Sequence, residues 1–246
     1  MQHILILGGT QEANQLASVF AEQNIHAVYS YAGRTWKPKP QPVPTRVGGF
    51  GGVQGMIDYL CSHGISHVID ATHPFAAQIS SNAAQACNAC NIPLMSLERR
   101  PWCRSEGDDW VDVKDISAAV AQLNNTGERV FLAIGKQDIA PFAGLNQHFF
   151  LLRFVEITGD EVLPYNCKII KDRGPFILKN DMELLKKYQI TKIVSKNSGG
   201  SGARAKIDAA REAGISVVMI ARPASLNVQK VYSPEEVMNW LQLSLD

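Results

Sequence analysis

The sequence lacks several features that would place it in well-known classes of protein. Its 246 residues contain no apolar run of the roughly 18 residues that a membrane-spanning helix needs. Lysine and arginine number 24 and aspartate and glutamate 23, so the net charge of +1 gives no overall attraction to nucleic acid or to an anionic membrane. Any recognition of an anionic ligand must therefore be local.

Cysteine is sparse, and we expect no signal peptide at the amino terminus. The five cysteines are scattered, without the density of a disulfide-stapled secreted domain, so we expect free thiols. Cys87 and Cys90 have no second pair of metal ligands, so buried thiols are favoured over zinc and no metal site is expected. The apolar residues 4–7 are too few for the core of a signal peptide. We expect a cytoplasmic protein.

Motifs for phosphoryl and acyl transfer are also missing. The sequence has no Walker A lysine motif and no G-x-S-x-G elbow. Tyr188 and Lys192 have the spacing found in short-chain dehydrogenases, but they straddle a predicted helix end and strand start, so they would not share a helical face.

The sequence does contain a regular alternation of short apolar segments with helix-like segments. This alternation is typical of parallel βαβ units. It pauses in the polar stretch 104–109 and then resumes. We predict an α/β fold of two Rossmann-like domains, residues 1–98 and 99–246, with mainly parallel sheets facing a central cleft. The predicted strands are 4–7, 27–31, 67–70, 93–97, 111–113, 130–134, 149–154, 168–170, 193–195 and 217–220, and the predicted helices are 12–23, 53–63, 76–89, 116–123, 181–188, 203–213 and 234–243.

Two loops of the first domain predict a phosphate-bearing cofactor. Gly8-Gly9-Thr10 separates the first strand from the first helix, where backbone amides and the positive helix end can approach a phosphate. The full G-x-G-x-x-G spacing is missing, and a tight turn that needs glycine is the alternative. After the second strand, where an acid would suit NAD, Arg34 and Thr35 suit a 2′-phosphate. NADP is therefore favoured, with a solvent-exposed arginine as the alternative.

A third loop, at the end of the strand 67–70, carries Thr72 and His73. Both are expected at the same sheet edge as the glycines. His73 suits three tasks: positioning a nicotinamide, donating a proton or capping the turn.

A proline-rich segment follows Arg34 and Thr35. Residues 37–44 place proline at every second position, which excludes a helix and favours an extended surface path. A stiff connector and a flap beside the ligand edge are both compatible with this pattern.

The second domain concentrates positive charge in one segment. From Lys168 to Lys196 there are eight basic residues and three acids. The loop from Lys196 to Gly200 again follows a strand and precedes a helix, which predicts an anion-binding nest. Arg173 and Lys196 are the basic residues that best suit a ligand rich in carboxylates.

Six motifs follow one another along nearly the whole chain. They are GGT-x-EA at 8–13, AGRT at 32–35, VGGFGG at 47–52, DATHPFA at 70–76, RGPF at 173–176 and KNSGG at 196–200. Their order and spacing resemble those of the precorrin-6A reductase family of cobalamin biosynthesis. The resemblance implies NADPH-dependent reduction of one double bond of the precorrin-6A macrocycle, giving precorrin-6B, with cofactor and substrate meeting in the cleft.

The resemblance and the loops together assign expected roles. His73 or Lys136 is expected to donate the proton that follows the hydride, although water would also serve. The expected cofactor-binding residues are Gly8, Gly9, Thr10, Glu12, Arg34, Thr35, Thr72 and His73. The expected substrate-binding residues are Arg173, Lys196, Asn197, Ser198, Gly199 and Gly200.

Three alternatives stay open at this point. The substrate macrocycle of the resembled family either carries cobalt or lacks it, and the motifs are the same in both cases. The second alternative is a reductase that uses NADP on another substrate. The third is a dinucleotide sensor that regulates a partner without turnover. A monomer is favoured, although the sequence does not fix the oligomeric state.

Overall fold

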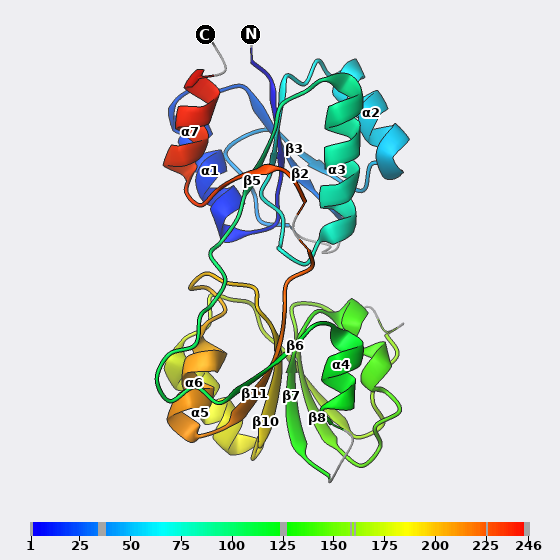
Figure 1. Cartoon of the computed structure of the whole chain (residues 1–246), viewed down its shortest axis with the longest axis vertical. Coiled ribbons are helices and arrows are strands. Elements are labelled where there is room, and N and C mark those ends of the chain that lie inside the picture. Colours follow the sequence, from blue (N-terminus) through cyan, green and yellow to red (C-terminus); the bar gives the residue numbers. More distant parts are fainter. Residues whose placement is uncertain are drawn as a thin grey trace. The chain divides into compact units, whose positions relative to one another are not determined.

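The computed structural model of the chain describes residues 2–33, 38–123, 127–157, 159, 161–224 and 226–243. The chain divides into two compact units (Figure 1): unit 1 is Met1–Arg100 with Pro223–Asp246, and unit 2 is Pro101–Arg222. Each unit holds one six-stranded sheet, and all the strand pairs are parallel. The predicted α/β class with two Rossmann-like units is confirmed.

The sheet of unit 1 has the strand order of dinucleotide-binding folds. Its order is β12-β5-β4-β1-β2-β3, which matches the order 3-2-1-4-5-6 with β12 as the sixth strand. The order reverses between β1 and β4, so the loops after these two strands lie where such sheets bind ligands. The strands are β1 (Ile4–Leu7), β2 (Ala27–Tyr31), β3 (Thr45–Val47), β4 (His67–Asp70), β5 (Leu94–Leu97) and β12 (Gln229–Val231).

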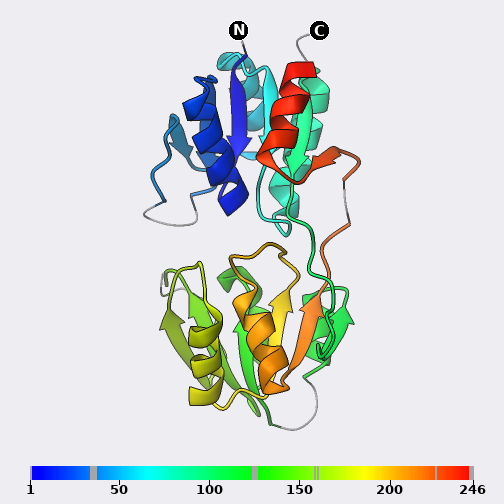
Figure 2. The same cartoon turned by 90° about the vertical axis from the view of Figure 1, so that its left-hand side faces the viewer.

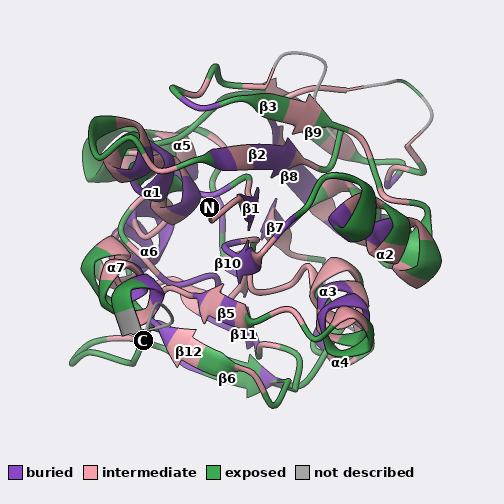
Figure 3. Cartoon of the chain, turned by 90° about the horizontal axis from the view of Figure 1, so that it is seen from above, coloured by how far each residue is buried: buried purple, intermediate pink, exposed green. Residues whose placement is uncertain are grey.

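Helices cover both faces of this sheet (Figure 1). Side chains alternate along a strand, so Ile4 and Ile6 pack in one apolar cluster while Leu5 and Leu7 pack in the other. The first cluster includes residues of α1 and α7 and the second residues of α2 and α3, and the outer faces of these helices are exposed (Figure 3). The helices are α1 (Gln11–Glu22), α2 (Gly52–Ser62), α3 (Ala77–Cys90) and α7 (Pro234–Leu243).

The prediction that residues 99–246 form one domain is wrong for the last part of the chain. Residues 223–246 belong to unit 1, where β12 pairs with β5 and α7 lies beside α1 (Figure 2). Val237 and Leu241 are buried in the same cluster as Phe20 of α1. β12 has only three residues, too few for an apolar pattern that predicts a strand. The apolar face of α7 packs against α1, which is distant in the sequence, so the sequence does not show which unit α7 joins.

Unit 2 is a second parallel sheet, in the order β6-β11-β10-β7-β8-β9. The order reverses between β7 and β10, so the loops after these strands are the expected ligand edge. The helices α5 and α6 cover one face, and α4 with two 3-10 helices covers the other (Figure 1). The elements are β6 (Trp110–Val113), α4 (Ile116–Ala121), β7 (Arg129–Ala133), η1 (Lys136–Asp138), η2 (Ala140–Phe142), β8 (Phe149–Phe154), β9 (Cys167–Lys171), α5 (Leu178–Lys187), β10 (Lys192–Lys196), α6 (Ala205–Ala213) and β11 (Ser216–Ile220).

Most predicted elements are present within two residues of their expected ends. The helix predicted from residue 181 begins three residues earlier, at Leu178, while β3 and β12 are strands that the sequence did not predict. Within the described ranges, no helix has the length and apolar character needed to cross a bilayer. The same ranges contain no group of three or more potential metal ligands.

Candidate functional site

The glycine loop after β1 lies against the ring of Tyr29. A Cβ at Gly8 would come within 2.1 Å of the Tyr29 Cζ atom, so only glycine fits there. Gly9 has a φ of +115°, and its N–H donates to Tyr29 Oη at 2.8 Å. The two glycines therefore serve different purposes, since one allows close approach and the other a positive φ.

The first turn of α1 offers backbone donors to an anion. Thr10 caps the helix, because its Oγ1 accepts from Ala13 N–H at 3.1 Å, and the same hydroxyl donates to Ala71 O at 2.7 Å. The Thr10 hydroxyl has thus given its proton to the protein, and it joins the loops after β1 and β4. The N–H groups of Thr10, Gln11 and Glu12 have no acceptor among the described residues. They form the positive end of the helix.

The carboxylate of Glu12 faces an arginine. Glu12 Oε2 lies 3.7 Å from Arg99 Nε, and both side chains are largely buried. Burial lowers the pKa of Arg99, while the Glu12 charge opposes that shift. Because Arg99 balances the Glu12 charge, the first turn of α1 stays favourable for a phosphate. Arg99 was not predicted from the sequence as a residue of this site.

The loop after β4 is organised by the buried Asp70. Its Oδ1 accepts from the Thr72 N–H at 3.1 Å and from the Thr72 hydroxyl at 2.7 Å. His73 is exposed, and its Nδ1 accepts from Phe75 N–H at 3.2 Å. An accepting Nδ1 places the proton of a neutral ring on Nε2. The turn-capping contact is therefore present, and Nε2 is the ring atom with a proton to give.

Arg46 on β3 holds the glycine-rich loop before α2, and the sequence analysis missed it. Its Nη1 donates to Ser30 Oγ at 2.7 Å and to Gly48 O at 2.9 Å, and its Nη2 donates to Gly49 O at 3.1 Å. The guanidinium also lies 3.9 Å from the centroid of the Phe50 ring. These contacts of Arg46 hold the glycine-rich loop in place.

The predicted 2′-phosphate residues, Arg34 and Thr35, lie outside the described residues. Their role stays a prediction.

In unit 2, two predicted lysines lie at the carboxyl ends of β7 and β10: Lys136 is in the loop after β7, and Lys196 is the last residue of β10. Lys196 Nζ lies 2.6 Å from Asp138 Oδ2, which joins the two loops. Lys136 Nζ lies 3.3 Å from Glu161 Oε1. Both lysines therefore lie at the edge of this sheet where a ligand is expected, and each is oriented by an acid that was not predicted from the sequence.

Arg173 lies on a different loop, after β9. It is exposed, and its Nη2 is 3.8 Å from Glu156 Oε1. Such an exposed pair contributes little to stability, so the guanidinium can exchange Glu156 for another carboxylate at small cost.

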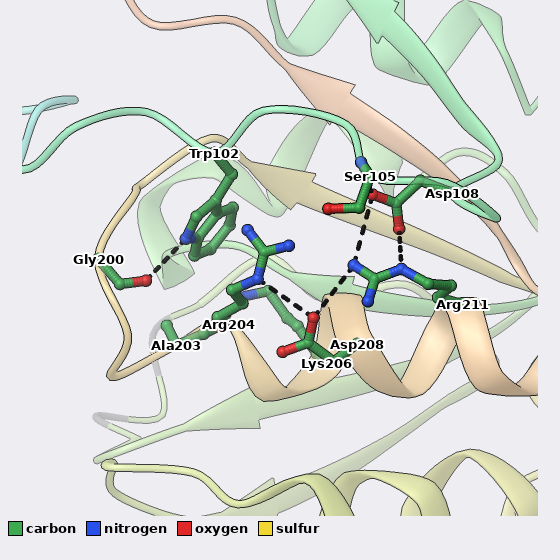
Figure 4. A network of polar contacts seen from close by, with 9 residues as sticks. All are labelled: Trp102, Ser105, Asp108, Gly200, Ala203, Arg204, Lys206, Asp208 and Arg211. Carbon is green, nitrogen blue, oxygen red and sulfur yellow. Dashed lines mark hydrogen bonds and ion pairs between the residues drawn. The ribbon is translucent and has the colours of Figure 1, made fainter.

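Trp102 fixes the loop that follows Lys196. Asn197 Oδ1 accepts from Trp102 N–H at 2.8 Å, and Asn197 Nδ2 donates to Trp102 O at 3.0 Å. The indole N–H of Trp102 donates to Gly200 O at 2.7 Å (Figure 4). The ammonium group of the buried Lys206 lies 4.8 Å from the Trp102 ring centroid. The Asn197 side chain thus acts as a structural clamp.

Arg222 donates hydrogen bonds to backbone carbonyl groups of the same loop. Its Nε donates to Asn197 O at 3.0 Å, and its Nη2 donates to Ser198 O at 3.2 Å. Gly199 and Gly200 both have a φ of +69°. The N–H groups of these two glycines and of Ser201 have no acceptor within the described part of the chain. With its carbonyls engaged by Arg222 and Trp102, the loop presents amides suited to an anion.

Comparison with known proteins decides the family. The family model described as "Precorrin-6x reductase CbiJ/CobK" matches residues 3–242. The chain belongs to this reductase family. It is 49% identical to the precorrin-6A reductase of Rhodobacter capsulatus over 98% of this chain and 96% of that one. It is 29% identical to the cobalt-precorrin-6A reductase of Priestia megaterium, over 97% of each chain.

A solved structure agrees with this assignment. The structure described as "CobK precorrin-6A reductase" has a TM-score of 0.95 and 49% sequence identity, over 98% of this chain and 96% of that one. The predicted family and the oxidoreductase class are confirmed.

A reductase needs a hydride donor, and the unit 1 sheet of this CbiJ/CobK family member indicates a nicotinamide cofactor. The residues present fit such a group. The N–H groups at the start of α1 suit a pyrophosphate, and a Cβ on the exposed Gly9 would meet nothing within 4 Å. Gly9 therefore leaves room for close approach of a ligand to the backbone, whereas the space beside Gly8 is filled by the Tyr29 ring.

Proposed function

We propose that this chain reduces precorrin-6A with NADPH as the hydride donor. The observation that carries the proposal is the family match over residues 3–242, joined to an α1 start whose N–H groups have no acceptor among the described residues. The cofactor supplies the hydride when it is bound, and the protein's part is to hold and orient it.

The first unit holds the dinucleotide in this proposal. The N–H groups of Thr10, Gln11 and Glu12 bind the pyrophosphate, with Gly9 leaving room for it and Gly8 letting the Tyr29 ring pack beneath the loop. Arg34 and Thr35 bind the 2′-phosphate, because a guanidinium and a hydroxyl suit a dianion. Thr72 and His73 serve the nicotinamide end, since they follow β4 at the point where the strand order reverses.

The second unit binds carboxylates of the tetrapyrrole. The amides of Gly199, Gly200 and Ser201 receive one carboxylate, and Lys196, oriented by Asp138, lies at the beginning of the same loop. Arg173 receives another carboxylate in place of Glu156. Asn197 and Ser198 contribute through the shape of the loop, which their contacts with Trp102 and Arg222 maintain.

Two groups suit the protonation that follows hydride transfer. His73 donates from Nε2, because its Nδ1 accepts from Phe75 N–H. Lys136 donates from Nζ, which Glu161 orients. His73→Gln and Lys136→Met separate these roles: the variant of the true donor loses turnover at saturating NADPH, whereas the other variant keeps it. If both variants keep full turnover, water supplies the proton.

Sequence identity to the known relatives supports the cobalt-free macrocycle as the substrate. The relatives named precorrin-6A reductase are 42–49% identical to this chain. Those named cobalt-precorrin-6A reductase are 26–29% identical.

The test combines cofactor binding with turnover. NADPH and NADH are titrated into the wild type and Arg34→Ala by nucleotide fluorescence, and NADPH oxidation is then followed with precorrin-6A and with its cobalt complex. We expect the wild type to prefer NADPH, the variant to lose about tenfold in NADPH affinity, and turnover to be faster on the cobalt-free substrate. Equal binding of both nucleotides would overturn the cofactor assignment. Binding without turnover on either macrocycle would favour another substrate or a sensor.

A further inference from the structure

A chain of hydrogen bonds joins the glycine loop to the proline-rich segment. Tyr29 Oη accepts from Gly9 N–H at 2.8 Å and donates to Asn14 Oδ1 at 2.9 Å. Gln41 Nε2 donates to the same Asn14 oxygen at 2.9 Å and to Tyr31 Oη at 2.6 Å. The Asn14 oxygen is thus the junction between a bond that fixes the glycine loop and one that fixes the proline-rich segment.

The proline-rich segment is docked along its length on β2. Tyr31 Oη donates to Lys39 O at 2.7 Å, and Tyr29 N–H donates to Pro44 O at 2.8 Å. Gln41 lies between these two anchors and contacts Lys39 O as well, at 3.3 Å. Because proline fixes φ, holding a segment of this composition costs little chain entropy. These contacts hold the segment against the sheet, which suits the stiff connector as well as a flap beside the ligand edge.

The docked segment fixes one end of the stretch that contains Arg34 and Thr35. That stretch leaves β2 through Gly33, which has a φ of +76° and packs close to Gly48. It re-enters the described chain at Pro38, one residue before the Lys39 anchor. Both flanks of the predicted 2′-phosphate residues are therefore held by the protein.

We propose that Gln41 is a specificity-determining positioning residue for NADPH, and that Tyr29 positions the loop that serves NADPH and NADH alike. This inference rests on the proposed function. Tyr29 holds the Gly9 amide and so shapes the start of α1, where the pyrophosphate common to both nucleotides binds. Gln41 holds the segment beside Arg34 and Thr35, which only the 2′-phosphate requires. Burial raises the pKa of Tyr29, so its hydroxyl keeps the proton it donates to Asn14.

The test compares affinities for the two nucleotides in matched variants of the full chain. Gln41→Leu keeps the size of the side chain and removes its donors, while Gln41→Glu keeps an oxygen acceptor but has no N–H to give Asn14. Tyr29→Phe removes one hydroxyl. Gln54→Leu is the control, because Gln54 is an exposed residue of α2 that contacts Asp58 one turn away. Dissociation constants for NADPH and NADH are measured by fluorescence titration, together with each variant's melting temperature.

The expected results separate the two residues. Both Gln41 variants weaken NADPH binding about tenfold and leave NADH binding unchanged, whereas Tyr29→Phe weakens both by the same factor, on the order of threefold to tenfold. Gln54→Leu changes neither. Equal loss of NADPH and NADH affinity in the Gln41 variants, or no loss, would overturn the inference while leaving the proposed function standing. A wild-type chain that binds neither nucleotide would overturn both.

Discussion

Replacing Gly8 by alanine is expected to destabilise unit 1 strongly. The added methyl would lie 2.1 Å from Tyr29 Cζ, 2.2 Å from Cε1 and 2.4 Å from Oη, whereas carbon atoms in contact sit about 3.5–4.0 Å apart. The ring must therefore shift by about 1.5 Å. The Tyr29 ring is fully buried, and its hydroxyl is hydrogen-bonded to both Gly9 and Asn14. The ring therefore cannot shift by this distance without losing those hydrogen bonds.

The size of the effect follows from these contacts. Overpacking a core costs about 1–3 kcal/mol, and each lost hydrogen bond adds about 1 kcal/mol. With both bonds of the Tyr29 hydroxyl lost, the sum is about 3–5 kcal/mol, and its lower end already corresponds to a melting temperature lower by about 10 °C for a unit of this size. Thermal unfolding followed by circular dichroism measures it.

Two further variants test the steric reasoning. Gly49→Ala is the control, because a Cβ there meets nothing within 4 Å, and we expect a change within about 0.5 kcal/mol. Tyr29→Leu removes the ring that the methyl strikes, so the double variant Gly8→Ala with Tyr29→Leu should lose less than the two single losses combined. A Gly8→Ala protein that melts within about 2 °C of the wild type, or strict additivity in the double variant, would refute the clash.

Three more predictions concern other contacts of unit 1. Arg46→Lys should cost about 2 kcal/mol in chemical unfolding, because one ammonium cannot reproduce the three bonds and the stacking of the guanidinium. Burial lowers the pKa of His67, so the unfolded chain takes up a proton at a higher pH than the folded chain does. The free energy of unfolding should therefore decrease as the pH falls below about 6.5. Unfolding titrations at pH 7.5 and 5.5 should show a smaller decrease for His67→Gln than for the wild type. Cys61 Sγ and Cys90 Sγ lie 3.9 Å apart, so one peroxide molecule should convert the two thiols to a disulfide and two waters, detected as a cross-linked peptide by mass spectrometry.

Each of these predictions has its own contrary result. An Arg46→Lys protein as stable as the wild type would mean that the guanidinium contacts add nothing. An unchanged pH dependence in His67→Gln would remove His67 as a cause of acid sensitivity. Cross-links through the exposed Cys103 instead of Cys90 would show that exposure, and not the 3.9 Å separation, decides the pairing.

The elements and loops that depend on a local pattern of apolar residues could be predicted from the sequence. The run 4–7 was recognised as a strand because all four side chains are apolar, and it is a fully buried central strand of unit 1. The loops after β1, β4 and β10 were found because glycine, threonine and histidine follow apolar runs. By contrast, β3 and β12 have three residues each and depend on their neighbours in the sheet.

The supporting residues of the site were harder to predict, because their partners are distant in sequence. Tyr29 looked like an ordinary strand residue, and only the fold brings its hydroxyl to Gly9 and Asn14. Trp102 is 95 residues from Asn197, and Arg222 reaches that loop from beyond β11. The acid partners of Lys136 and Lys196 are likewise set by loop geometry in three dimensions.

The sixth strand of unit 1 has a consequence for how the protein is made. When the ribosome has finished residue 100, β5 still lacks its neighbour β12, and the apolar side of α1 lacks α7. The whole of unit 2, Pro101–Arg222, must be translated first, which takes roughly 6 to 25 s at ordinary rates of synthesis. During that interval unit 2 can fold from a continuous stretch of chain, while the nascent nucleotide-binding sheet keeps an open edge that chaperones or other nascent chains can reach.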